Sequence, residues 1–141
     1  MTELVIDASV ALAWCFGDER TEATASLLER LQTDAAAVPS LWHLEVANGL
    51  ALAERRGRIT PAESAELIAL LEMIEIVVDG DTPARAFTRV LDLAREERLT
   101  AYDAAYLGRG GRIARGLSRL RLAVVHGCAF VARSAPRRCG R

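Results

Sequence analysis

The hydrophobic positions of the chain fall into two patterns, short unbroken runs and longer stretches with helical spacing. Three short runs, at residues 4–6, 35–38 and 74–78, predict strands, because a brief apolar run is typical of a strand buried on both faces. Helical spacing predicts helices around these runs, at residues 10–16, 19–33, 41–56 and 61–73. Alternating strands and helices predict an α/β fold, with a parallel sheet flanked by helices on both faces.

Capping residues mark where several of these helices begin and end. Thr60 and Glu63 have the spacing of a capping box, which predicts a helix start. Gly57 is typical of the residue that follows a helix. Thr82 and Pro83 predict the start of a further helix. One face of that helix should carry Phe87, Val90, Leu91 and Ala94.

Length and composition narrow the class of protein. A chain of 141 residues is expected to form a single domain, over residues 1–141, with one core. No basic segment precedes the first apolar run, and no apolar run approaches the roughly 20 residues of a membrane span. We therefore expect a cytoplasmic protein. Three cysteines without a Cys-x-x-Cys pair and two isolated histidines argue against a disulfide framework, a zinc site and histidine catalysis.

Asp7 is the first candidate for a site, because it follows the first predicted strand directly. Ligands of open α/β sheets bind at the rim outside the carboxyl ends of the strands. The alternative is that Asp7 only caps the helix that follows, which is a common role of Asp at such a position.

Two further acids are candidates for the site, one beside an apolar helix face and one at the start of a helix. Glu45 lies beside the apolar face of the helix predicted at residues 41–56, where a charge is costly unless it is paired, hydrogen-bonded or bound to a metal. Its alternative role is a rim glutamate that reaches solvent or pairs with an arginine. Thr100 and Asp103 again have the capping-box spacing, so Asp103 begins a helix.

An α/β sheet could bring Asp7, Glu45 and Asp103 together, since they lie at a strand end, on an inward helix face and at a helix start. Clustered carboxylates repel one another, and a bound hard divalent cation usually offsets this repulsion. The chain has no lysine that could serve instead. Mg²⁺ fits this ligand set best.

Three segments resemble the PIN-domain ribonucleases, and in particular the VapC-like toxins of bacterial toxin–antitoxin pairs. They are VIDAS at residues 5–9, PSLWHLEVAN at residues 39–48 and LTAYDAAYL at residues 99–107. Order, spacing and context agree over residues 3–107. The resemblance implies an endoribonuclease that depends on Mg²⁺ or Mn²⁺ and acts on RNA.

The same resemblance implies roles for particular residues and partners. It makes Asp7, Glu45 and Asp103 the metal ligands, and Ser9, Thr100 and Asn48 nearby polar or substrate contacts. It also implies a VapB-like antitoxin as inhibitor and a homodimer. The helices around residues 23–31 and 41–52, together with Trp14 and Trp42, offer apolar surface for such a partner, unless all of it is core.

The segment at residues 108–141 departs from the family pattern. The family normally continues to a strand that supplies a fourth acid, for which residues 120–125 are the candidate strand, yet no acid follows Asp103 and nine arginines do. We interpret the segment as a frameshift near the codon for Leu107 in a GC-rich gene, which would impair the enzyme. The alternative is a basic arm that binds RNA phosphates.

Two other functions compete with the toxin-type nuclease. Phosphoacceptor receivers and aspartyl-phosphate hydrolases also place an Asp after the first strand, but they need a lysine, and the hydrolases a second acid where this chain has Ser9. The second competitor is a catalytically impaired PIN-fold module that binds antitoxin or RNA without cleavage. Because the fourth acid is missing, this alternative stays open, and metal-dependent cleavage would separate it from the enzyme.

Overall fold

The computed structural model describes residues 3–116, 124–126 and 129–131, and the side chains of residues 4–108. Its centre is a parallel sheet of three strands, β1 (Glu3–Val5), β2 (Ala35–Pro39) and β3 (Ile76–Asp79), in the order β1-β2-β3. Val5 pairs with Ala37 in the register of the sheet, and Pro39 pairs with Asp79. The carboxyl ends of the three strands therefore lie along one edge.

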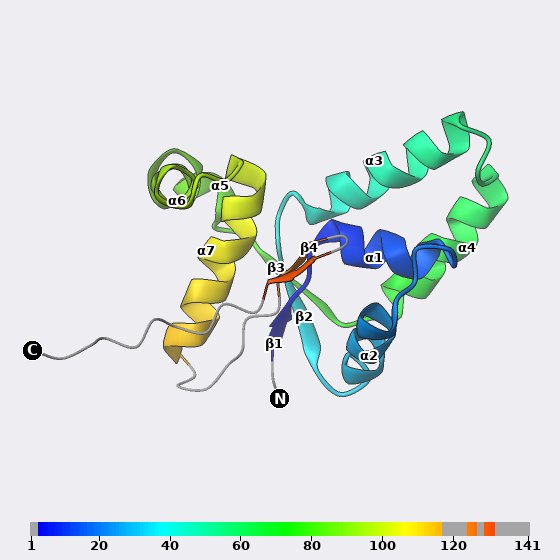
Figure 1. Ribbon diagram of the computed structural model, residues 1–141, viewed down its shortest axis with the longest axis horizontal. Coiled ribbons are helices and arrows are strands. Elements are labelled where there is room, and N and C mark those ends of the chain that lie inside the picture. Colours follow the sequence, from blue (N-terminus) through cyan, green and yellow to red (C-terminus); the bar gives the residue numbers. More distant parts are fainter. Residues whose placement is uncertain (1–2, 117–123, 127–128, 132–141) are drawn as a thin grey trace, which may run out of the picture.

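Helices flank the sheet on both sides (Figure 1). On one side lie α1 (Ala8–Cys15), α2 (Glu22–Arg30), α3 (Trp42–Arg55) and α4 (Pro61–Glu72). On the other lie α5 (Thr82–Arg85), the π-helical turn η1 (Ala86–Val90), α6 (Leu91–Glu97) and α7 (Ala101–Gly116). The predicted α/β fold with helices on both faces is confirmed, with most element boundaries within three residues of those predicted.

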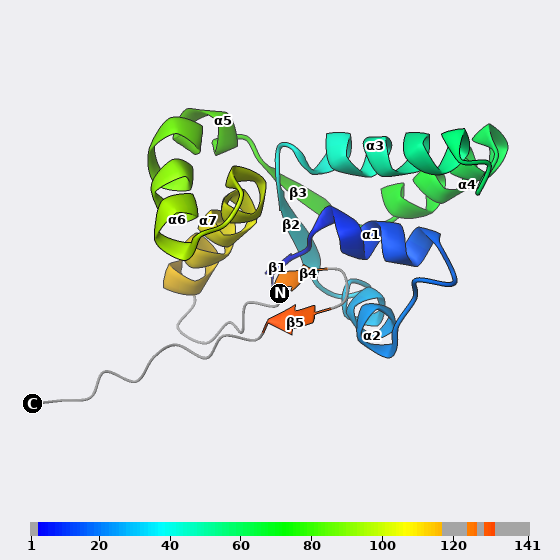
Figure 2. The same cartoon turned by 45° about the horizontal axis from the view of Figure 1, so that its top comes forward.

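Two short strands follow α7 in the chain. β4 (Val124–His126) and β5 (Ala129–Val131) pair with each other in antiparallel orientation (Figure 2). The strand predicted at residues 120–125 coincides with β4 at Val124 and Val125, and its first residues lie outside the described ones. None of the helices that the structure describes is long and apolar enough to cross a membrane.

The core forms because β2 is covered on both faces. Ala36, Ala37 and Val38 are completely buried, and Ile6 at the end of β1 is 1% exposed. Small alanines in β2 let helices pack closely on either side of the strand. Trp14, whose indole Nε1 donates a hydrogen bond of 2.7 Å to the Thr24 carbonyl oxygen, ties α1 to α2.

A close approach between α1 and α3 brings two of the candidate acids into the same region. A Cβ atom added at Gly49 would lie 2.4 Å from Leu12 Cδ1, so α3 meets α1 at a glycine. Glu45 lies one helical turn before this contact, and Asp7 directly precedes α1. The packing of the two helices therefore positions the start of α1 near the Glu45 side of α3.

The helix predicted after Pro83 is divided into three pieces, which corrects one predicted face. Val90 and Ala94 are buried as predicted, but Phe87 is 90% exposed. The cause is η1, which contains both Phe87 and Val90, because a π turn holds more residues than an α turn and so moves Phe87 off the face that carries Val90. Such a turn leaves no simple signal in the hydrophobic spacing.

Substitutions at two residues with positive φ should change stability in opposite directions. Arg98 ends α6 with φ 54°, and Gly57 follows α3 with φ 67°. Left-handed backbone costs a residue with a Cβ roughly 1 kcal/mol and glycine almost nothing. Arg98→Gly should therefore raise the free energy of unfolding by about 1 kcal/mol, and Gly57→Ala should lower it by a similar amount. Urea unfolding of both variants measures the changes, and a loss of stability in Arg98→Gly would contradict this account.

Candidate metal centre

Asp7 lies at the carboxyl end of β1 and at the N-cap position of α1. Its backbone is extended, with φ −79° and ψ 153°, but its side chain makes no capping hydrogen bond. The Ser9 hydroxyl instead donates a hydrogen bond of 2.5 Å to Asp7 Oδ2. The alternative in which the carboxylate serves only as a helix cap is therefore wrong, and the contact with Ser9 fixes the orientation of a half-buried acid.

Glu45 lies on the side of α3 that faces α7. The Tyr106 hydroxyl of α7 donates a short hydrogen bond to Glu45 Oε2. Tyr106 is 1% exposed and is one of the largest fully buried side chains among the described residues. Glu45 is therefore a half-buried acid whose carboxylate accepts a hydrogen bond from a buried tyrosine.

The Tyr106 hydroxyl also connects Glu45 to Asp7. Burial raises the pKa of Tyr106 far above its ordinary value, and the hydrogen bond to Glu45 and the charges of Glu45 and Asp7 raise it further. A hydrogen bond with the backbone of Ala8, the first residue of α1, acts in the opposite direction on this pKa. Asp7 and Glu45 thus act on one hydroxyl group, which stays protonated between them.

Asp103 lies three residues before Tyr106 in the first turn of α7, which places the two side chains on neighbouring positions of one helix face. Its backbone N–H donates a 3.1 Å hydrogen bond to the hydroxyl of Thr100, so Thr100 caps the helix as its spacing predicted. Asn48 follows Glu45 by one turn of α3 and is exposed. The candidate residues thus come from the starts of α1 and α7 and from one face of α3.

The donor set fits a hard divalent cation in its chemistry. Carboxylate oxygens are the ligands that Mg²⁺ prefers, and one or two carboxylates with water and phosphate oxygens suffice to hold it. Within the part of the chain that the structure describes, no three His, Cys, Asp or Glu side chains are grouped so as to hold a metal ion. Asp7 and Glu45 are the pair related through Tyr106, and the assignment of Asp103 as a third ligand stays a prediction.

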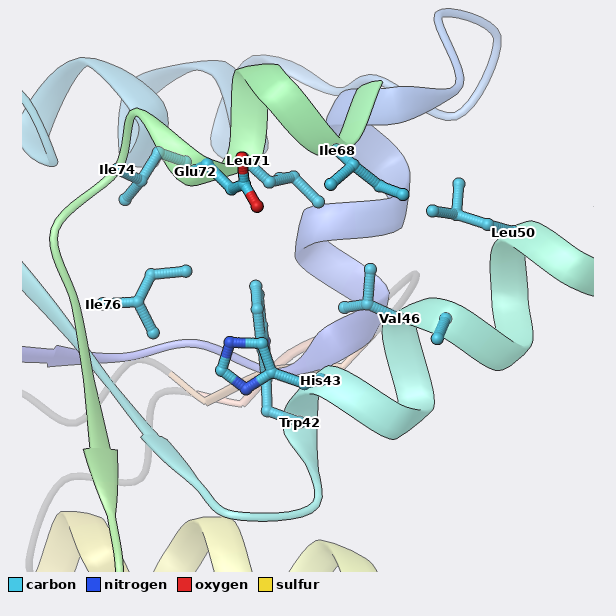
Figure 3. A pocket seen from close by; sticks show the side chains of 10 residues that line it. Trp42, His43, Val46, Leu50, Ile68, Leu71, Glu72, Ile74 and Ile76 are labelled. Atoms are coloured by element: carbon cyan, nitrogen blue, oxygen red, sulfur yellow. The ribbon is translucent and has the colours of Figure 1, made fainter. Parts of the chain in front are cut away.

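A separate apolar pocket of about 400 Å³ lies between α3, α4 and the start of β3. In Figure 3 Val46 and Leu50 of α3 face Ile68 and Leu71 of α4 across it. Trp42 lines the pocket but is 2% exposed, and Trp14 of α1 is 6% exposed. Both tryptophans therefore belong to the core, which corrects their prediction as surface for a partner. The apolar side chains that do reach solvent include Leu44, Ile68, Leu70 and Met73.

Reasoning from the sequence missed two residues that organise this edge of the sheet. Tyr106 could have been identified from its spacing, since it lies three residues after Asp103 and therefore on the same helix face. Asp79 ends β3, is 5% exposed, and pairs with Arg85 of α5. The sequence gives little indication of this ion pair. An acid and an arginine six residues apart come together only when the chain turns between them.

The comparison with protein families identifies the class to which this fold belongs. The PIN domain family matches residues 4–108. The chain therefore belongs to the PIN domain family. PIN domains are nucleases of RNA or DNA and typically depend on divalent metal ions. No curated protein matches the chain.

The raised pKa of Tyr106 predicts an alkaline limit to stability. A raised pKa means that the protonated hydroxyl stabilises the fold below about pH 10, the ordinary tyrosine value, and that this contribution is lost as the pH rises further. In Tyr102→Phe, which leaves Tyr106 as the only tyrosine, tyrosinate absorbance should appear only where the chain unfolds. Absorbance and circular dichroism across one pH titration test this. Half-ionisation near pH 10 in a folded chain would contradict it.

Proposed function

We propose that this chain is a toxin-type endoribonuclease that hydrolyses RNA phosphodiester bonds with Mg²⁺, or Mn²⁺, and is inhibited by a cognate antitoxin. The observation that supports this proposal best is the relation of Asp7 and Glu45 to one buried hydroxyl at the carboxyl edge of the sheet. Two acids in such a setting suit a cation that binds phosphate oxygens. In this proposal Asp103 contributes a third ligand from the first turn of α7.

Each residue of the site has a physical task in this reaction. A bound divalent cation supplies an activated water and a positive charge beside the scissile phosphate. Asp7 and Glu45 provide the negative charge that binds the cation, and the Ser9 hydroxyl holds Asp7 in one orientation. Thr100 fixes the start of α7, and with it the backbone of Asp103. In this proposal Asn48, which is exposed one turn beyond Glu45, contacts the RNA backbone.

Asp7→Asn tests the role of the first acid. The amide keeps the size of the side chain and can still accept the hydrogen bond from Ser9, but it loses the charge. RNA cleavage in Mg²⁺ should fall about 100-fold or more, because several kcal/mol of transition-state stabilisation depend on the metal. Asp92→Asn, which neutralises an exposed acid of α6, is the matched control and should cleave normally. Equal cleavage by both variants would remove Asp7 from the mechanism.

A catalytically impaired module that binds antitoxin or RNA without cleaving is the second candidate function. It is favoured by the absence of any acid after Asp103, where the resemblance implies a fourth one. The same cleavage assay decides between the two functions. An unmodified chain that binds RNA but leaves it intact in Mg²⁺ and in Mn²⁺ would favour the module.

The apolar pocket between α3 and α4 is our candidate surface for the antitoxin. Ile68, 44% exposed, lines this pocket, and Met73 at the end of α4 is 82% exposed. An amphipathic helix of a small VapB-like protein would remove such side chains from water. The resemblance to VapC-like toxins also makes a homodimer expected, which sedimentation would measure.

Co-expression with the product of the neighbouring small open reading frame tests the antitoxin. We expect a stable complex and rescue of growth. Ile68→Asp should weaken the complex, because it places a charge in the pocket, whereas Leu70→Asp should not. Leu70 is the matched control, since it lies on the same helix and is exposed but does not line the pocket. Absence of both a complex and growth rescue would refute the proposed partner.

A further inference from the structure

The outer edge of the sheet at β3 presents backbone groups that no other described strand pairs with. β3 stands last in the strand order, so only its inner edge is bonded to β2. The Ala36 N–H donates a hydrogen bond of 2.8 Å to the Glu75 carbonyl oxygen, and this bond fixes the alternation along the strand. Since the backbone groups of successive residues point to opposite edges, Val77 faces β2, whereas Ile76 and Val78 face outwards.

This edge lacks the side chains that usually protect an edge strand. Natural edge strands commonly carry a lysine, a proline or a bulge that prevents pairing with another chain. β3 consists of Ile, Val, Val and Asp, and its register with β2 runs from Ile76 to Asp79 without a bulge. Val78 is 44% exposed, so the apolar surface of the strand continues to its outer edge. An edge of this kind suits the addition of a further strand.

The charge around β3 indicates which strand would fit. Residues 61–81, which include α4 and β3, contain six acids and no basic residue. Glu66, Glu72 and Glu75 are exposed among them. A segment that approaches the edge of β3 therefore meets negative charge, which basic side chains would complement.

The same acids argue against a second copy of the chain as the added strand. Antiparallel pairing of β3 with itself about Val77 would place Glu75 of each copy opposite Asp79 of the other. Like charges directly opposite each other destabilise a pair of strands. A basic segment of a different protein avoids this repulsion.

We propose that the outer edge of β3 binds an extended segment of a partner protein, in which apolar residues alternate with arginine or lysine. The backbone of the segment pairs with the outward groups of Ile76 and Val78. Its apolar side chains pack against Val78, and its basic side chains lie near the exposed acids of α4 and of Glu75. This inference goes beyond the proposed function, because it holds whether or not the chain cleaves RNA.

The competing explanation is that water alone satisfies this edge. β3 has only four residues, and a short edge strand is itself a form of protection. In that case a basic peptide would be attracted by charge only, and its affinity would not depend on its backbone N–H groups. The role of the backbone therefore separates the two explanations.

Two capped synthetic peptides, in which valine alternates with arginine, provide the test. In the control peptide every backbone amide nitrogen carries a methyl group, so the charge stays but no backbone N–H can be donated. Hydrogen exchange of the isotope-labelled chain, followed by magnetic resonance, should slow at the amides of Ile76 and Val78 with the first peptide only. The first peptide should bind at least about 10-fold more tightly, because several backbone hydrogen bonds are lost together in the control.

Val78→Pro tests the edge from the side of the chain, with Val78→Ala as its matched control. Proline removes the outward N–H of residue 78 and is tolerated at an outward position of an edge strand. The affinity for the first peptide should fall about 10-fold in Val78→Pro and less than about 3-fold in Val78→Ala, which keeps the N–H. Glu72→Gln combined with Glu75→Gln should weaken binding and reduce its dependence on salt.

Each outcome either supports the docking edge or overturns it. Equal binding of the two peptides, or no binding of the first, would overturn it. If Val78→Pro does not fold, the comparison of the two peptides on the unmodified chain decides. A dimer of the unmodified chain that Val78→Pro dissociates would make a second copy the occupant and would also overturn the proposal. RNA cleavage enters none of these measurements, so their result is independent of the proposed function.

Discussion

The burial of β2 on both faces is the constraint on which the rest of the structure depends. Ala36, Ala37 and Val38 have no exposed surface, so helices must cover the sheet on either side. Charged side chains are then disfavoured in the middle of the strands and lie near the strand ends. Asp7 and Asp79 follow this rule directly, since Asp79 is the last residue of β3 and Asp7 lies two residues beyond the end of β1. The site is thus a consequence of the way the core is built.

Acids that lie at one edge of the sheet each need a partner that stabilises the carboxylate. Asp79 is neutralised by Arg85, which fixes the turn from β3 into α5. Asp7 accepts a hydrogen bond from the Ser9 hydroxyl, and Glu45 accepts one from the Tyr106 hydroxyl. Desolvation keeps Tyr106 protonated beside these acids, so that it adds a donor and not a further negative charge.

The fold could be predicted from the sequence to the extent that local patterns determine it. Short apolar runs and the capping residues Thr60 and Gly57 fixed the strands and the helix ends, because these signals act within a few residues. The π turn that exposes Phe87 could not be foreseen, since the hydrophobic spacing of an ideal helix hides it. The burial of Trp42 depends on how α3 and α4 meet, and the contact between Tyr106 and Glu45 spans 61 residues of sequence. Such contacts are decided by packing and not by local pattern.

The start of α1 shows why a local rule gave the wrong role for one side chain. Asp is a favoured capping residue, and Asp7 does occupy the N-cap position, yet its carboxylate makes no capping bond. The backbone of Ala8, at the start of α1, lowers the pKa of Tyr106 from another helix. The Asp7 carboxylate accepts a hydrogen bond from the Ser9 hydroxyl at the edge of the sheet. Departures of this kind from local rules are expected at functional sites, and this one occurs at the acid that the proposed reaction needs first.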